Sequence, residues 1–457
     1  MLPESIAGAA ERFGERAALI AGDRRVTFAD LDELSSRAAS ALAADGVRQG
    51  TVAALTMPSG VDYVVAYLAL AKLGAITAGI NPRLSREERK RVLERLQPDA
   101  IVNSLMLATG FVQPVPTDPD RIVTVVFTSG TSGEPKGAVF TNRQLEAITT
   151  IDAGGLDAWG TGGPVLGGTQ FCHIGFMTKL QWYLRLGCSV LVQERWRPSV
   201  ALDLIERHRV RSVGGVAAQI ALLLREPDFN DHDLSCVETI VVGGGPSPPE
   251  LVREACRRFG ASYSIRYSST ESGGVGTATA FDAPDDEALY TVGRPRPGVE
   301  VRVAADGEIL LRSPAAMTGY WRDEERTAAT IDCDGWLHTS DLGEIDGNGC
   351  LRIVGRVNDM YIRGGYNVHP LEVESVLAEH PSVAAVAIVP RADPVMGEIG
   401  VAVVVPSGGP PTLEGLRAFA APRLAAYKLP EGIEIVDALP ITSMEKLDRA
   451  VLKSLVE

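Results

Sequence analysis

A strand that runs directly into a glycine-rich stretch limits the possible folds of this chain more than any other feature. Residues 122–127 (Ile-Val-Thr-Val-Val-Phe) have the β-branched and aromatic side chains of a buried strand. Residues 128–137 (Thr-Ser-Gly-Thr-Ser-Gly-Glu-Pro-Lys-Gly) follow, with glycines that let backbone amides approach a ligand and with hydroxyls and a lysine suited to phosphate. The spacing does not fit a Gly-x-x-x-x-Gly-Lys loop, and a plain surface turn is the alternative. We expect a nucleotide triphosphate to bind at Thr128, Ser129, Gly130, Thr131, Ser132, Gly133 and Lys136.

Length and composition indicate a globular protein of more than one domain. At 457 residues the chain exceeds the roughly 250–300 at which a single core stops growing. Its net charge of −14 argues against a nucleic-acid or anionic-membrane partner held by overall charge. The longest apolar run near the start, residues 64–71, is too short to span a bilayer, and no signal peptide is visible. The six cysteines include no Cys-x-x-Cys pair, so we expect a cytoplasmic protein with reduced thiols and no membrane span.

The first part of the chain alternates between helical and strand patterns. Residues 28–44 and 63–73 have helical spacing, residues 51–56 have strand character, and residues 75–82 are predicted to form a second strand and turn. Such alternation predicts an α/β domain with a largely parallel sheet.

Two later stretches carry candidate ligand-binding residues. A predicted strand at 239–242 ends in three glycines, which allow a planar ligand to approach the backbone, although a tight connection to the next helix explains them nearly as well. These are Gly243, Gly244 and Gly245. In residues 266–271 (Arg-Tyr-Ser-Ser-Thr-Glu), Tyr267 can stack on adenine, the Thr270 hydroxyl can contact the α-phosphate, and Glu271 can hold Mg²⁺.

In this order, the motifs resemble those of the adenylate-forming superfamily of acyl-CoA synthetases, nonribosomal peptide adenylation domains and luciferases. The resemblance extends over nearly the whole chain, includes the predicted hairpin at 335–356 and residues 439–449, and is closest to the acyl-CoA synthetases. It implies an α/β protein with a large N-terminal domain of layered sheets and helices (1–357) and a small, mobile C-terminal α+β domain (358–457). In relatives the small domain rotates about a residue that matches Asn358.

The resemblance also assigns roles to single residues. Asp341 would hold the ribose hydroxyls with help from Arg356, although the two could simply form an ion pair on a solvated hairpin. Thr131 would join Glu271 at the metal, and Lys446 would be the catalytic lysine that bridges the carboxylate and the α-phosphate. The remaining assignments are a gate between acyl group and adenylate at His173, and a loop lining the tunnel of the CoA arm at Gly364 and Gly365.

Two positions depart from the family pattern. Ser268 and Glu445 both stand where glycine is usual. A side chain at Ser268 could shorten the acyl pocket or add a polar contact, which suggests a small or oxygenated acid. Glu445 places a like charge near the phosphates, so it could slow the first half-reaction or simply point to solvent.

The implied activity is ATP-dependent activation of a carboxylic acid through an acyl-adenylate, followed by thioester formation with CoA. The expected ligands are ATP, Mg²⁺, CoA and a small-molecule carboxylic acid whose identity and chain length the sequence does not give. A stand-alone enzyme that loads an acyl or peptidyl carrier protein, or one that passes the adenylate to an amine, is an alternative. Around His173 we find no aspartate of the kind that holds an α-amino group, which weakens an amino-acid substrate. A nucleotide- or acyl-binding protein that has lost catalysis through Ser268 and Glu445 is the third alternative.

Overall fold

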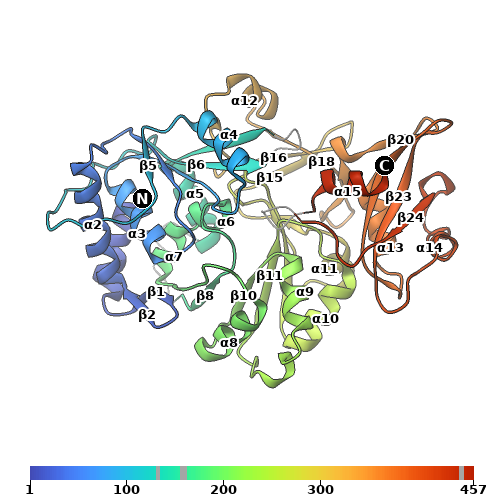
Figure 1. The fold of residues 1–457 in the computed structure, drawn as a ribbon, viewed down its shortest axis with the longest axis horizontal. Helices are drawn as coiled ribbons and strands as arrows, with labels where there is room; N and C mark the ends of the chain where they lie inside the picture. Colours follow the sequence, from blue (N-terminus) through green and yellow to red (C-terminus); the bar gives the residue numbers. More distant parts are fainter. Residues whose placement is uncertain (130–133, 155–161, 442–446) are drawn as a thin grey trace.

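The computed structural model of the chain describes residues 1–129, 134–154, 162–441 and 447–457. Figure 1 shows a large layered part, which runs in sequence from blue to yellow, and a small part in orange and red beside it. The predicted α/β class, with a large N-terminal and a small C-terminal domain, is confirmed. Within the described ranges no helix is both long and apolar enough to cross a membrane.

The sheet that contains the glycine-rich hairpin has the order β17-β7-β6-β4-β3-β5. Its strands are β3 Val52–Leu55, β4 Ile76–Gly79, β5 Ala100–Val102, β6 Ile122–Ser129, β7 Pro135–Thr141 and β17 Gly319–Tyr320. Strands β3 to β6 pair in parallel, and β7 and β17 add antiparallel pairs at one edge. The sequence therefore predicted the parallel part of this sheet correctly, whereas the short strand β17 was not anticipated.

Helices α2 (Phe28–Ala44), α3 (Val61–Lys72) and α4 (Arg86–Leu96) connect these first strands. The predicted helix at 28–44 is confirmed at both ends, and a capping box formed by Thr27 and Asp30 stabilises its N-terminal end. Helix α3 begins two residues before its predicted start, and every residue except Asp62 is buried, as expected for a helix that is apolar on all sides.

Three further sheets complete the large domain. Their orders are β2-β1-β9-β8, β10-β11-β12-β13-β14 and β15-β16-β18-β19. The strands are β1 Ala17–Ala21, β2 Arg24–Thr27, β8 Pro164–Gly167, β9 Ser189–Val192, β10 Ser212–Gly215, β11 Thr239–Gly243, β12 Ser262–Tyr267, β13 Thr277–Ala278, β14 Arg294–Pro295, β15 Glu300–Val303, β16 Glu308–Arg312, β18 Leu337–Ile345 and β19 Leu351–Arg356. The helices are α1 Leu2–Phe13, α5 Asn142–Ala153, α6 Ile174–Met177, α7 Leu180–Leu186, α8 Pro198–His208, α9 Ala217–Arg225, α10 Pro249–Phe259, α11 Asp285–Tyr290 and α12 Glu324–Thr330.

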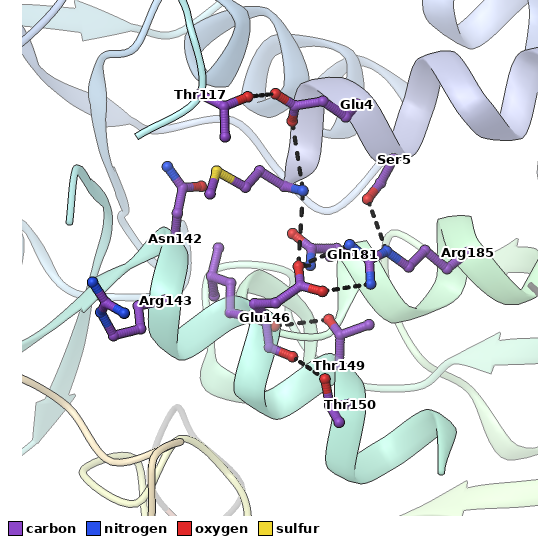
Figure 2. A network of polar contacts seen from close by, with 12 residues as sticks. Glu4, Ser5, Thr117, Asn142, Arg143, Glu146, Thr149, Thr150, Gln181 and Arg185 are labelled. Atoms are coloured by element: carbon purple, nitrogen blue, oxygen red, sulfur yellow. Dashed lines mark hydrogen bonds and ion pairs between the residues drawn. The ribbon is translucent and has the colours of Figure 1, made fainter. Parts of the chain in front are cut away.

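A buried polar network fixes α5, the helix that follows the glycine-rich hairpin. Glu146 of α5 accepts hydrogen bonds from Arg185 of α7 at 2.6 and 2.8 Å and from Gln181 at 2.8 Å (Figure 2). Arg185 also donates from Nε to the hydroxyl of Ser5 on α1, at 3.3 Å. The carboxylate of Glu146 thus joins α5 to α7, and Arg185 extends the network to α1.

The small domain has its own sheet and its own core. The sheet has the order β21-β20-β23-β22, with β24 paired to β23. Its elements are β20 Tyr361–Arg363, β21 Tyr366–Val368, α13 Pro370–Leu377, β22 Val383–Asp393, β23 Gly397–Pro406, α14 Leu413–Ala420, β24 Gly432–Ile435 and α15 Arg449–Val456. A single 3-10 turn, Val357–Asp359, separates β19 of the large domain from β20.

Candidate active site

A buried carboxylate stands at the end of the β18–β19 hairpin. Asp341 and Arg356 are directly opposite one another in the antiparallel register, and Arg356 donates from Nε to Asp341 Oδ1 at 2.6 Å. The hydroxyl of Tyr267, the last residue of β12, donates to Asp341 Oδ2 at 2.7 Å. The ion pair considered as an alternative from the sequence is present; its carboxylate is buried, at 6% exposure, whereas the Arg356 side chain is exposed. Burial and the charge of Asp341 raise the pKa of Tyr267, which keeps the phenol protonated as a donor.

The residue before Asp341 has a backbone conformation that residues other than glycine rarely adopt. Ser340 has a φ of 58°, in the left-handed region, and its amide donates to Glu308 Oε1 at 2.8 Å. The amide of Asp341 donates to the Thr339 hydroxyl at 3.1 Å. On the far side of Asp341, a Cβ at Gly343 would lie 2.5 Å from the carbonyl oxygen of Arg352, so only glycine fits there. The carboxylate is thus aimed by a strained turn held by specific hydrogen bonds.

A second polar group lies at the other end of the segment 267–271. Glu271 Oε1 accepts a hydrogen bond from the hydroxyl of Tyr320 at 2.8 Å. The ammonium group of Lys136 lies over the ring of the same Tyr320, 5.7 Å from its centroid. Burial and the nearby Glu271 carboxylate raise the pKa of Tyr320. The structure therefore brings together Lys136 and Glu271, two residues predicted from separate motifs, through a tyrosine that the sequence analysis missed.

The segment 267–271 is held in place by the turn that follows it. The backbone amide of Ser269 donates to the Ser272 hydroxyl at 2.9 Å, and the amide of Ser272 donates to the Ser269 hydroxyl at 3.0 Å. Gly273 has a φ of 74°, and a Cβ there would lie 2.3 Å from the Ala315 carbonyl oxygen. Ser268 and Thr270 are half-buried on this turn, between Tyr267 and Glu271.

The three glycines predicted to contact a planar ligand, Gly243, Gly244 and Gly245, adjoin this segment and are called the glycine wall below. Gly243 ends β11 and pairs in parallel with Arg266 of β12. Gly244 has a φ of 82°, and a Cβ at Gly245 would meet nothing within 4 Å. Exposed backbone therefore lies at the carboxyl end of β11, next to Tyr267.

His173 caps the short helix α6 and contacts the end of another strand. Its Nε2 lies 3.2 Å from Asn81 Nδ2, and Asn81, two residues beyond β4, is 4% exposed. The preceding Cys172 is buried, and burial raises its thiol pKa to about 12. A thiol of this kind is not reactive at neutral pH.

Of the remaining predicted residues, some lie in the described ranges and some lie outside them. Thr128 lies opposite Lys136 across the β6–β7 hairpin, and Gly364 and Gly365 form the two-residue turn between β20 and β21, with φ of 55° and 87°. Residues outside the described ranges are Gly130, Thr131, Ser132, Gly133, Glu445 and Lys446. Ser129 closes β6, opposite Pro135.

The two-domain fold and its glycine-rich hairpin are those of an adenylate-forming enzyme. The chain belongs to the family of AMP-binding enzymes: the family model matches residues 6–109 and 103–321, and the model of the C-terminal domain of AMP-binding enzymes matches residues 372–446. The predicted resemblance is therefore confirmed.

The similarity to individual relatives extends over nearly all of this chain and nearly all of each relative. The 3-[(3aS,4S,7aS)-7a-methyl-1,5-dioxo-octahydro-1H-inden-4-yl]propanoyl:CoA ligase of Mycobacterium tuberculosis is 32% identical over 99% of this chain and 98% of its own. The o-succinylbenzoate CoA synthetase of Bacillus subtilis, solved with an acyl-adenylate intermediate, is 30% identical with a TM-score of 0.88, over 99% and 98% of the two chains. The amide bond synthetase of Marinactinospora thermotolerans is 28% identical with a TM-score of 0.89, over 100% of both chains.

Proposed function

We propose that this chain is an AMP-forming acid–thiol ligase that activates a carboxylic acid with ATP and transfers the acyl group to CoA. The observation that carries the proposal is the placement of two polar groups at the two ends of residues 267–271. At one end Asp341 is bound by Tyr267 and Arg356, and at the other Glu271 is bound by Tyr320 beside Lys136. A carboxylate suits ribose hydroxyls, and a lysine suits phosphates, so the two ends fit one nucleotide.

In the first half-reaction, a carboxylate oxygen of the acid attacks the α-phosphorus of ATP, and the bond to pyrophosphate breaks. The ribose hydroxyls would donate to Asp341, and the Thr270 hydroxyl would contact the α-phosphate. Lys136, with the hydroxyls and amides of residues 128–133, would bind the outer phosphates. Lys446 would stabilise the charge that develops at the α-phosphate.

Glu271 fits a metal ligand, because it is half-buried and forms no ion pair with any residue in the described ranges. Mg²⁺ bound there and at Thr131 would neutralise phosphate oxygens. Tyr320 would hold the carboxylate in position from its other side.

In the second half-reaction, the thiol of CoA attacks the acyl carbon and AMP leaves. We propose that the domains comprise residues 1–357 and 358–457, and that the small domain turns about Asn358 between the two steps. The 3-10 turn at Val357–Asp359, which lies between two separate sheets, supports this position. The β20–β21 turn with Gly364 and Gly365 would then line the path of the CoA arm, and His173 would separate this path from the acid site.

The test is pyrophosphate release from Mg-ATP over a panel of acids, with products identified by mass. Acid-dependent release with formation of an acyl-CoA supports the proposal. The likeness to an amide bond synthetase makes an amine the second candidate acceptor, so each acid is also tested with amines and with a phosphopantetheinyl carrier protein. No release with any acid would overturn the ligase proposal in favour of a binding protein.

A further inference from the structure

Two cationic side chains bind the carboxylate of Asp152, and a third cation, Arg266, lies on β12 beside the glycine wall. Asp152, near the end of α5, accepts a hydrogen bond from Lys179 Nζ at 2.5 Å and forms an ion pair with Arg296. Asp152, Lys179 and Arg296 are largely buried, with side chains 11%, 13% and 19% exposed.

Arg266 differs from the other two cations because it has no carboxylate partner. Within the described ranges its guanidinium forms no ion pair, and its Cζ lies 5.9 Å from the ring centroid of the exposed Phe281. The side chain is half-buried, and burial together with repulsion from Arg296 lowers the pKa of Arg266. Lys179 and Arg296 thus share the Asp152 carboxylate, whereas the charge of Arg266 has no carboxylate partner within the described ranges, in a chain whose net charge is −14. A partly buried cation of this kind favours an anion from outside the chain.

The cluster borders the proposed acid site and not the ribose end. Arg266 immediately precedes Tyr267 on β12, and successive strand side chains point to opposite faces, so Arg266 points away from Asp341. It lies against Gly243 of the glycine wall, where a Cβ would meet the Arg266 Cβ at 3.3 Å. Lys179 donates to the carbonyl oxygen of Gly274, in the turn after Glu271, at 3.3 Å.

The same turn connects the cluster to the predicted gate. A Cβ at Gly274 would lie 3.4 Å from Ile174, the residue after His173, and 3.5 Å from Lys179 Cε. Ile174 of the gate segment and Lys179 therefore both contact the turn that follows Glu271, and Arg266 contacts the glycine wall at Gly243.

We propose that Arg266 binds a second carboxylate, at the end of the acid remote from the group that is activated, so that the enzyme acts on dicarboxylic acids. This inference rests on the proposed function for the reaction that the enzyme catalyses. The preference for a diacid over its ester rests only on the position and charge of Arg266. Arg266 is a specificity residue here, because it takes no part in the transfer of the adenylyl group.

The experiment compares α,ω-dicarboxylic acids with their monomethyl esters, which have nearly the same length but lack the second charge. For the parent enzyme, we expect kcat/KM for pyrophosphate release to be about 10- to 100-fold higher with the best diacid than with its ester, the range of a charge-assisted hydrogen bond. R266M should abolish this preference while leaving kcat/KM for the ester within about threefold, and R266K should restore part of it. The matched control is R211Q, which removes an exposed arginine paired with Glu238 just before β10 and should change neither substrate.

Calorimetric binding of the diacid and its ester in the presence of AMP separates this inference from the proposed function. A diacid preference in binding that R266M removes supports the inference even where no acid releases pyrophosphate. Equal binding and equal turnover of diacid and ester by the parent would overturn it. So would an R266M variant that loses both substrates equally, because that loss would show a general structural role.

Discussion

Substitution of Asp341 by asparagine separates its role in the fold from its proposed role at the ribose. The variant keeps the size of the side chain and one acceptor oxygen but loses the charge. The Tyr267 hydrogen bond, 2.7 Å long, changes from a charge-assisted to a neutral one, which costs about 1 kcal/mol. The Arg356 pair adds at most about 1 kcal/mol, because the arginine side chain is 53% exposed. We therefore expect the free energy of unfolding to fall by about 1–2 kcal/mol, too little to unfold a typical domain.

The effect on the nucleotide should be larger. Two ribose hydroxyls that donate to a carboxylate would each lose about 1 kcal/mol on meeting an amide, so about 2 kcal/mol is lost in total. This corresponds to an increase of roughly 30-fold in the KM for ATP, with the KM for the acid little changed. Steady-state pyrophosphate release over a range of ATP concentrations measures the first quantity, and urea denaturation measures the stability.

The matched control lies on the same hairpin. Asp346 accepts hydrogen bonds from the backbone amides of Asn348 and Cys350 at 2.9 and 3.0 Å, so Asp346→Asn perturbs the hairpin without touching the proposed ribose site. It should leave the KM for ATP unchanged. If Asp341→Asn loses stability as calculated but binds ATP like the parent, the carboxylate is purely structural and the ribose assignment is wrong.

Three further predictions concern the rest of the site. Burial alone would raise the pKa of the Asp152 carboxyl, but the charges of Lys179 and Arg296 outweigh it and hold the pKa below the usual 3.8. The ionised carboxylate therefore stabilises the folded state at pH values above the unfolded pKa. This stabilisation is lost as the pH falls through the folded pKa. Asp152→Asn should lower the free energy of unfolding by about 3–5 kcal/mol at pH 7, and the difference between the denaturation curves should narrow only below about pH 4; a gap that is constant down to pH 3 would contradict this. Gly365 and Gly408 are exposed glycines that share a φ of 87° and open surroundings, so alanine at either position should lower the free energy of unfolding by about 1–2 kcal/mol. Only Gly365→Ala should raise the KM for CoA. An equal KM for CoA in the two variants would show that Gly365 does not line the CoA path. Lys446→Ala should reduce the rate of pyrophosphate release by about 10²–10³-fold with the KM for ATP nearly unchanged, and a rate near that of the parent would exclude the proposed catalytic role.

The sequence predicted those parts of the site that lie on single continuous segments. Residues 122–127 and the helix at 28–44 follow from local patterns and caps, and the pairing of Asp341 with Arg356 follows from one hairpin. The contact of Tyr267 with Asp341 joined two motifs whose order in the chain already suggested a common ligand.

The missed features are contacts between distant segments that have no motif of their own. Tyr320 reaches Glu271 from β17, a strand of two residues that pairs with the glycine-rich hairpin only in the folded sheet. The cationic cluster draws Asp152, Lys179, Arg266 and Arg296 from four separate elements or loops, and nothing in the local sequence marks them as neighbours. Such contacts depend on the docking of layers, which periodicity does not encode.

The position of Arg356 joins two parts of the molecule that are otherwise separate. It is both the arginine bound to Asp341 and the last residue of β19, after which a single turn leads into the small domain. A ligand that hydrogen-bonds to the Asp341 oxygens would displace this arginine or share the oxygens with it, directly before the turn that leads to the small domain. We therefore expect occupancy of the proposed ribose site to influence the orientation of the small domain through this one side chain.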